Sequence, residues 1–368
     1  MTSFLDHAGC WFLHSGIQES NGTEFNGGVA RYFRADSGRN AAVSNEITGY
    51  AASAFAYLYS LSGRREYLDA CARAARYLCD HAWDPSTATF PFEPGSPHVY
   101  FFDTGIIARG LMAASRATGD QSFATRACEA ARSLSLDFSA DSKSPGAFPP
   151  VIALPDKTPL RDEPRWSRSP GCYQLKSALA WLETGDPHAR RCFDAALEYA
   201  LATHESFLAK EPDREKLMDR LHAYCYFLEA LLFTAERDEA RAALDTGIDR
   251  VGALLREIAP DFERSDVCAQ LLRLRLIAHH LEFAPLNEIA AREEADRAAA
   301  YQACLSSDAA DARNVIDTRL RGGFWFGRKR GEVLPYMNPV STAFSMQALA
   351  LWEQHRTGAW RFELHQLI

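Results

Sequence analysis

The chain has 368 residues, a formal net charge of −8 at pH 7 and a hydrophobic fraction of 47%. The negative charge argues against a nucleic-acid partner, since such proteins usually present a basic surface. The nine cysteines are scattered and include no Cys-x-x-Cys pair, which favours reduced thiols in a cytoplasmic protein over a disulfide framework. The N-terminus carries no long apolar run, so neither a signal peptide nor a membrane span is expected there.

The first predicted elements are a helix and a loop. In residues 2–17, apolar side chains recur at helical spacing, as the following residues show: Phe4, Leu5, Ala8, Trp11 and Phe12. Residues 20–44 are rich in glycine and asparagine. We expect a loop there, with a short strand at 28–34.

Residues 45–82 form the unit that the rest of the chain repeats. Residues 45–62 are apolar on nearly every face, which predicts an inner helix that is buried on all sides. Gly63 follows, as is typical of a helix C-terminus. Residues 64–82 have a single apolar stripe, which predicts an amphipathic outer helix. Together the two helices would form an αα-hairpin.

The same hairpin recurs along the chain, with glycine turns at Gly63, Gly119 and Gly185. The predicted inner helices are 103–119, 171–183, 219–235, 266–281 and 339–355. The predicted outer helices are 121–136, 187–203, 238–258 and 285–305. The last inner helix has no outer partner after it, and the N-terminal helix can supply that partner. Six inner and six outer helices then close a ring.

The connections between hairpins support this interpretation. Helix pairs are also found in open solenoids, but the repeat here is longer than that of the short-repeat arrays. The extra length falls between each outer helix and the next inner helix, in four long loops at 82–102, 137–169, 207–216 and 306–338. Long ordered loops often carry function. The sequence therefore predicts an all-α fold, an (α/α)6 toroid that forms one domain over residues 1–368, with its functional loops at one mouth.

Three motifs carry a resemblance to a known group of proteins: Glu46-Ile-Thr-Gly-Tyr50, Phe102-Asp-Thr-Gly105 and Asn338-Pro-Val-Ser-Thr342. With the hairpin repeat, they make the whole chain similar to the six-hairpin glycosidase-like superfamily. That superfamily includes unsaturated glucuronyl hydrolases, N-acylglucosamine 2-epimerases and polysaccharide lyases. The resemblance implies sugar chemistry at the mouth of the ring. It does not select a single family, because one fold hosts many functions.

Glu46 and Asp103 are the leading catalytic candidates, because each begins an inner helix and precedes a Thr-Gly pair. Acidic residues at helix starts also serve as caps, which is the alternative interpretation. Glycoside hydrolysis needs two carboxyl groups, about 6.5–9.5 Å apart for inversion and about 5–5.5 Å apart for retention. Neighbouring inner helices lie about 8–10 Å apart, so the inverting distance is within reach.

The loop at 161–176 is the densest polar and aromatic cluster. Arg165, Arg168 and Lys176 are suited to binding a carboxylate, and Trp166 offers a face for a sugar ring. Tyr173 is a candidate phenolic acid or base. The alternative is a solvated loop whose tryptophan fills the hairpin junction. Two more carboxylates of this loop are alternative catalytic groups: Asp162 and Glu163.

The remaining candidates stand near other predicted helix starts. His222 is a candidate proton shuttle, although a hydrogen-bonded structural histidine is equally expected at that position. His98 and Tyr100 precede Asp103 and are either substrate-binding residues or ordinary loop packing. In the last mouth loop we expect a short aromatic strand at 324–326. Four residues of that loop are candidate substrate-binding groups: Arg319, Trp325, Tyr336 and Asn338.

Several signals are absent from the sequence. It has no Gly-x-Gly-x-x-Gly or Walker loop, no His-Glu-x-x-His and no clustered Cys/His set, so no cofactor or metal is expected apart from a Ca²⁺ site that sequence would not reveal. We therefore predict an enzyme that hydrolyses a glycosidic bond in a sugar or oligosaccharide, with uronic acids as candidate components. The alternatives are an epimerase or lyase that uses Tyr173, His222 or Lys176, and a non-catalytic toroid that binds a glycan or a protein.

Overall fold

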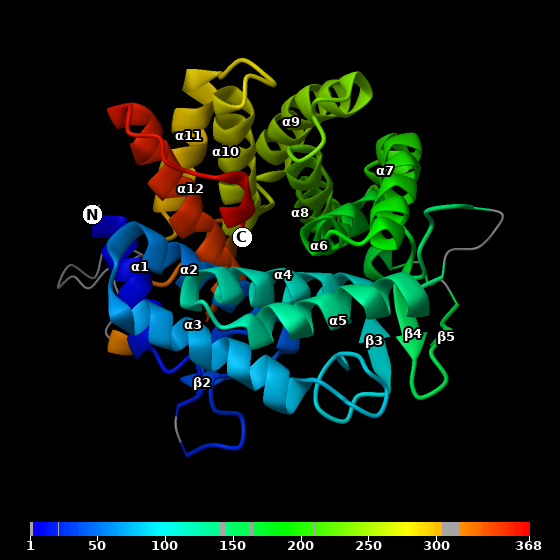
Figure 1. Ribbon diagram of the computed structural model, residues 1–368. Coiled ribbons are helices and arrows are strands. Elements are labelled where there is room, and N and C mark those ends of the chain that lie inside the picture. The colour runs from blue at the N-terminus through cyan, green and yellow to red at the C-terminus, as the bar shows by residue number, and fades with distance from the viewer. Residues whose placement is uncertain are drawn as a thin grey trace. The chain divides into compact units, whose positions relative to one another are not determined.

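The computed structural model describes residues 3–20, 22–139, 144–161, 163, 165–209, 211–303 and 317–368. The chain forms two compact units. The central unit comprises Glu19–Val29 and Val43–Ala209. The terminal unit comprises Met1–Gln18, Ala30–Ala42 and Lys210–Ile368. Each unit contains three helical hairpins (Figure 1).

Three inner helices of the central unit pack side by side in chain order. They are α2 (Asn45–Ser62), α4 (Phe101–Thr118) and α6 (Leu175–Thr184). The outer helices α3 (Arg65–Tyr77), α5 (Gln121–Asp137) and α7 (Pro187–Phe207) each pack on the inner helix that precedes them. Gly63, Gly119 and Gly185 end the inner helices in the left-handed conformation, where an L side chain would be strained. The hairpins predicted at 45–82, 103–136 and 171–203 are confirmed.

Glycines bring the inner helices of the central unit close together. A Cβ atom on Gly110 would stand 2.3 Å from the carbonyl oxygen of Gly49. A Cβ atom on Gly105 would stand 2.5 Å from both the Cβ and the carbonyl oxygen of Ser177. The Thr-Gly pairs at 48–49 and 104–105 therefore have a packing role, because only glycine allows the backbones to approach this closely.

Replacing Gly110 with alanine is expected to destabilise the protein by about 1–3 kcal/mol, because a backbone atom of α2 has to move. The matched control is Gly252→Ala in α9 (Asp238–Ile258), where the nearest atom to the new Cβ is the tip of the Arg275 side chain. Thermal unfolding followed by circular dichroism compares the two variants. Equal melting temperatures for both variants would contradict close helix packing at Gly110.

The terminal unit repeats the arrangement with its own three hairpins. Its inner helices α8 (Arg214–Leu231), α10 (Ser265–His280) and α12 (Pro339–Thr357) pack in chain order, with α10 in contact with both of the others. The outer helices are α9, α11 (Glu288–Ala299) and α1 (Ser3–His14). Helix α1 packs on α12, which confirms the N-terminal helix as the partner of the last inner helix.

A buried charged side chain ties the three inner helices of the terminal unit together. Arg273 of α10 has no exposed surface and is ion-paired with the equally buried Glu229 of α8. It also donates a hydrogen bond of 2.8 Å to Oε1 of Gln347 in α12. Its guanidinium lies 4.0 Å from the centre of the Phe344 ring. An inner helix that is buried on all sides is usually apolar on every face. Arg273 departs from that pattern, and its charge is balanced by Glu229.

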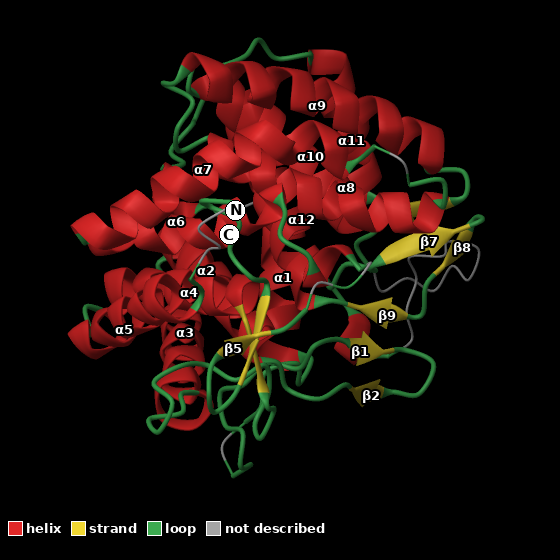
Figure 2. Ribbon diagram, turned by 90° about the vertical axis from the view of Figure 1, so that its right-hand side faces the viewer, coloured by secondary structure: helices red, strands yellow, loops and turns green. Residues whose placement is uncertain are grey.

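Three small antiparallel sheets occupy the long connections (Figure 2). In the central unit, β3 (His98–Tyr100) pairs with β4 (Val151–Ala153), which pairs with β5 (Thr158–Pro159). In the terminal unit, one sheet joins β2 (Arg39–Asn40), β1 (Phe33–Arg34) and β9 (Tyr336–Met337). The other sheet joins β6 (Phe262–Arg264), β7 (Gly327–Lys329) and β8 (Glu332–Val333).

Several predicted boundaries are wrong. Helix α8 begins five residues before the predicted start at 219, because the Asp213 side chain accepts hydrogen bonds from the amides of Glu215 and Lys216. The third inner helix begins as a short 3-10 segment at Cys172–Gln174. Helix α3 ends before residue 82 and continues as a π-helical turn at Leu78–Ala82.

The aromatic strand predicted at 324–326 is also wrong. Phe324 and Trp325 form only isolated bridges, and the amide of Phe324 is taken by the Thr342 hydroxyl at 3.1 Å. The strand begins at Gly327 instead. Part of the mouth loop predicted at 306–338 lies outside the described residues, as does Asp162. Among the helices of the described ranges, none has the length and apolar character needed to span a membrane.

Candidate active site

The two leading carboxylates lie at the same end of neighbouring inner helices. Glu46 is the second residue of α2 and is half-buried. Asp103 is the third residue of α4 and is 8% exposed. The hydroxyl of Ser177, near the start of α6, donates a hydrogen bond of 2.6 Å to the carbonyl of Phe102. The helix starts in this unit therefore gather around the first turn of α4.

Strand β3 leads directly into α4 and places Tyr100 beside Arg168. The Arg168 guanidinium donates to the Tyr100 hydroxyl at 2.9 Å and forms an ion pair with Glu163 at 2.8 Å. The hydrogen bond to Glu163 and the nearby Tyr100 raise the pKa of Arg168. Since Glu163 already neutralises it, Arg168 is a poorer anion binder than its sequence position suggested.

Two other candidates from this loop are buried. The Tyr173 ring is 1% exposed and meets the Trp166 ring edge-on at 5.1 Å, while its hydroxyl donates to the Ser169 carbonyl at 3.3 Å. Lys176 has no exposed surface. In this conformation neither side chain is accessible to a solvent-borne substrate. Trp166 itself is half-buried.

Arg165 and His98 remain accessible in the central unit. Arg165 is exposed, and no ion pair to it is recorded within the described ranges. It differs in this respect from Arg168, three residues later. His98 is half-buried on β3, where it pairs with Ala153. Of the three cationic candidates Arg165, Arg168 and Lys176, Arg165 is therefore best placed to meet an anionic ligand.

In the terminal unit, a polar cluster forms where α8 and α10 meet. We call Asp219, His222, Arg264, Asp266 and Gln270 the His222 cluster. Arg264 binds Asp266 through two hydrogen bonds of 2.9 and 2.7 Å and also reaches Asp219 at 2.7 Å. His222 Nδ1 lies 2.8 Å from Gln270 Oε1 and 3.7 Å from Asp266 Oδ2.

The contact with Gln270 fixes the proton on the His222 ring. A carboxamide oxygen only accepts hydrogen bonds, so Nδ1 must donate to it, and in the neutral ring Nε2 is left as an acceptor. Burial, together with the positive charge of Arg264, lowers the pKa of His222 to about 4, although Asp266 opposes the shift. Burial disfavours the charged form of Asp266, but Arg264 outweighs it and lowers the pKa of this carboxyl. The cluster therefore presents a neutral histidine beside a fixed ion pair.

The lowered pKa of His222 makes stability depend on pH. Between about pH 6.5 and 4 the unfolded chain binds a proton at this histidine that the folded chain does not bind. The free energy of unfolding therefore falls by about 3 kcal/mol as the pH decreases from 6.5 towards 4, and this group has no effect on it above pH 6.5. Thermal unfolding across this range should show a steeper loss for the wild type than for His222→Gln. His188→Gln, at an exposed histidine, should keep the wild-type profile, and parallel profiles for wild type and His222→Gln would contradict the prediction.

The candidates from the last mouth loop are mostly engaged in structural contacts. Arg319 is exposed, pairs with Asp317 and donates to the Gly38 carbonyl at 3.0 Å. Asn338 caps α12 by accepting from the amides of Val340 and Ser341.

Trp325 is 7% exposed, which leaves little of its ring for stacking on a ligand. Tyr336 is half-buried and stacks on Phe326, with ring centres 4.9 Å apart. Burial raises the pKa of Tyr336 to about 12. Of these two residues, Tyr336 keeps the larger accessible face.

Sequence reasoning missed the most tightly connected residues. Arg264, Asp266 and Gln270 were not predicted as site residues, although Asp266 was expected to start an inner helix. The available signal was positional, since Asp266 is the second residue of α10 just as Glu46 is the second residue of α2. Among the described residues, no group of three or more His, Cys, Asp or Glu side chains is arranged to hold a metal ion.

Comparison with solved structures shows what this arrangement of hairpins is similar to. The cellobiose 2-epimerase of Spirochaeta thermophila shares 13% sequence identity, with 95% of each chain covered and a TM-score of 0.64. An unsaturated glucuronyl hydrolase specific for heparin shares 12% identity over 96% of this chain and 97% of that chain, with a TM-score of 0.64. An α-mannanase of Bacteroides thetaiotaomicron shares 12% identity over 95% and 97% of the two chains, with a TM-score of 0.61.

These similarities establish the fold class. The chain has the (α/α)6-toroid fold of these solved structures, as the sequence predicted. No family model matches the chain, and no curated protein matches it. At identities this low the similarity extends to the fold alone, so the chemistry has to be argued from the residues.

Proposed function

We propose that this protein is a carbohydrate-active enzyme that hydrolyses a glycosidic bond by acid–base chemistry. The observation that carries the proposal is the placement of Glu46 and Asp103 in the first turns of two inner helices that pack together. One carboxyl group would protonate the leaving oxygen, and the other would activate water or attack the sugar. Its structural neighbours, which include a glucuronyl hydrolase and a mannanase, support sugar hydrolysis as the reaction class.

We further propose that the substrate carries a carboxylate, as a uronic acid does. Arg165 is exposed in the loop that precedes α6, and a guanidinium binds a carboxylate through two parallel hydrogen bonds. The other two cationic candidates are less suited, because Arg168 is ion-paired and Lys176 is buried. Arg165 is thus the proposed anion-binding residue.

Arg165→Ala should remove the thermal stabilisation that uronic acids give to the wild type. The expected loss of affinity is about tenfold or more, because a charged hydrogen bond contributes about 1.5–3 kcal/mol. The matched control is Arg161→Ala, at an exposed arginine of the same loop. A thermal-shift titration with uronic acids and neutral sugars makes the comparison. Stabilisation by uronic acids that survives in Arg165→Ala would contradict this role.

A second candidate function is epimerisation or isomerisation of a sugar. It is favoured by His222, whose neutral ring is oriented by Gln270 with Nε2 as an acceptor. Its unprotonated Nε2 can accept a proton from carbon, and its lowered pKa makes it a weaker base than an ordinary histidine. The solved cellobiose 2-epimerase and mannose isomerase structures share the fold. In deuterated water this reaction would keep the composition of the sugar apart from solvent deuterium introduced at carbon, whereas hydrolysis would cleave the glycosidic bond.

A further inference from the structure

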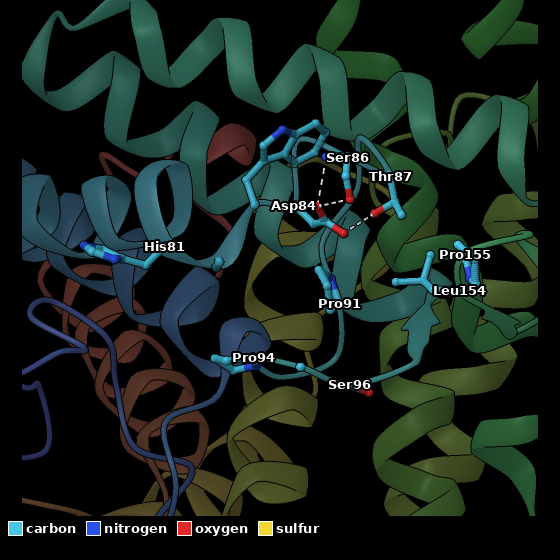
Figure 3. A pocket seen from close by; sticks show the side chains of 12 residues that line it. His81, Asp84, Ser86, Thr87, Pro91, Pro94, Ser96, Leu154 and Pro155 are labelled. Atoms are coloured by element: carbon cyan, nitrogen blue, oxygen red, sulfur yellow. Dashed lines mark hydrogen bonds between the residues drawn. The ribbon is translucent and has the colours of Figure 1, made fainter.

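A cavity of about 450 Å³ opens in the central unit, between the loop that follows α3 and the turn that follows β4 (Figure 3). Its volume falls within the range of about 300–1,000 Å³ that is typical of small-molecule sites. The lining changes from apolar to polar across the cavity, and Figure 3 shows Asp84, Ser86 and Thr87 facing Leu154 and Pro155. None of the candidate residues predicted from the sequence lines this cavity.

The apolar wall of the cavity is rigid. Pro91, Pro94 and Pro155 line it together with Leu154 and Trp83, and proline rings have fixed backbone geometry. The Trp83 ring is held edge-on against Phe90, with ring centres 4.9 Å apart, and the guanidinium of Arg126 lies 4.5 Å from its centre. Trp83 is only 8% exposed, so the proline rings and Leu154 supply the apolar surface that is available to one face of a pyranose ring.

The polar wall is organised around one carboxylate. Asp84 accepts hydrogen bonds of 2.7 Å from the hydroxyls of Ser86 and Thr87 and one of 2.9 Å from the Ser86 amide. The Thr87 and Ser86 hydroxyls hold the pKa of Asp84 below its ordinary value. No ion pair to Asp84 is recorded within the described ranges. An ionised carboxylate with remaining lone pairs accepts hydrogen bonds from ligand hydroxyls and repels a ligand anion.

A short ladder connects this cavity to the candidate active site. Ser96 lines the cavity and lies just before β3, and Leu154 lies just after the paired strand β4. The Leu154 amide donates to the Pro97 carbonyl at 2.8 Å. At its other end β3 enters α4, which carries Asp103. At about 3.3 Å per residue, the three residues of β3 span roughly 10 Å, so the cavity lies along the strand that leads to the carboxylate.

We propose that this cavity is a distal subsite that binds a neutral sugar unit of an oligosaccharide whose scissile bond lies near Asp103. The apolar wall takes the ring face, and Asp84 accepts hydrogen bonds from the ring hydroxyls. Asp84 excludes uronic acid units from this position, so the anionic unit binds elsewhere, near Arg165. The inference rests on the proposed function for the identity of the ligand.

The test measures affinity as a function of chain length. Isothermal titration uses cello-, manno- and xylo-oligosaccharides, from disaccharide to hexasaccharide, with Asp103→Asn protein so that the ligand is not consumed. Ser86→Trp fills the cavity from an exposed position, and Ser139→Trp, at an exposed serine that does not line the cavity, is the matched control. His81→Trp, from another part of the lining, replaces Ser86→Trp if that variant melts below the control.

Affinity for at least one neutral series should rise with chain length. Ser86→Trp should lower the affinity for the longer oligosaccharides of that series by about tenfold or more. The Ser139→Trp control should retain it. An unchanged affinity in Ser86→Trp, or no binding of any neutral series by a protein that still binds uronic acids, would overturn the subsite and leave the proposed function standing. If no sugar of either class binds or reacts, the proposed function fails, and the subsite fails with it.

Discussion

Replacing Asp103 with asparagine is expected to lower kcat by about 10²–10⁴-fold, the usual contribution of a general acid or base. The substituted side chain has the same shape, so the first turn of α4 should persist. It no longer transfers a proton. The change should therefore appear in kcat, measured on the substrate that the protein turns over, while the melting temperature stays close to that of the wild type.

The matched control for this substitution is Asp120→Asn. Asp120 caps α5 by accepting from the Ser122 amide at 3.0 Å, so it is another aspartate at the start of a helix, on an exposed turn. Its variant should retain full activity. If Asp103→Asn and Glu46→Gln both keep wild-type kcat, hydrolysis by this carboxylate pair is excluded.

Replacing Glu229 with glutamine is expected to destabilise the protein by about 3–5 kcal/mol, because it leaves Arg273 charged, buried and without its counter-ion. Neither side chain of the pair is exposed, so water cannot replace the lost carboxylate. Thermal or urea unfolding measures the difference. The effect should be among the largest of any single polar substitution in the terminal unit, since Arg273 also contacts α12.

Two controls isolate the buried charge. Glu353→Gln breaks an exposed pair with Arg356, whose atoms are 3.6 Å apart, and should cost no more than about 1 kcal/mol. The double variant Glu229→Leu/Arg273→Met removes both charges and should recover much of the stability lost in Glu229→Gln. A double variant that is as unstable as Glu229→Gln would show that packing, and not the unpaired charge, is responsible.

Helix periodicity and glycine turns were enough to predict the fold. The limits of α2 match the prediction, and the turns at Gly63, Gly119 and Gly185 have the left-handed conformation expected of them. Boundaries failed where tertiary or capping contacts decide them. The charged residues 214–216 were predicted as the end of a loop, yet the Asp213 cap and the contact of Arg214 with the Glu257 carbonyl at 2.8 Å extend α8 over them.

The candidate site was less predictable, because burial and pairing are not visible in a single sequence. Arg168 and Arg165 look alike in the chain, but only Arg168 meets Glu163 and Tyr100. Asp266 and Gln270 can be recognised as site residues only from their contacts with His222. His222 lies 48 residues from Gln270 along the chain, so the sequence does not reveal this contact. The Thr-Gly motifs supported the resemblance correctly, but their glycines are explained by the close approach of α2, α4 and α6.

The most direct test of a carbohydrate-active hydrolase is the mass of the products. The purified protein is incubated in ¹⁸O-labelled water with a panel of neutral and uronic-acid oligosaccharides, and the products are analysed by mass spectrometry. We predict cleavage of at least one uronic-acid-containing oligosaccharide, with one solvent oxygen in a product and loss of cleavage in Asp103→Asn. A product of unchanged mass would favour epimerisation, and an ultraviolet-absorbing unsaturated sugar would indicate elimination. A folded protein that leaves every sugar unchanged would contradict the proposed activity.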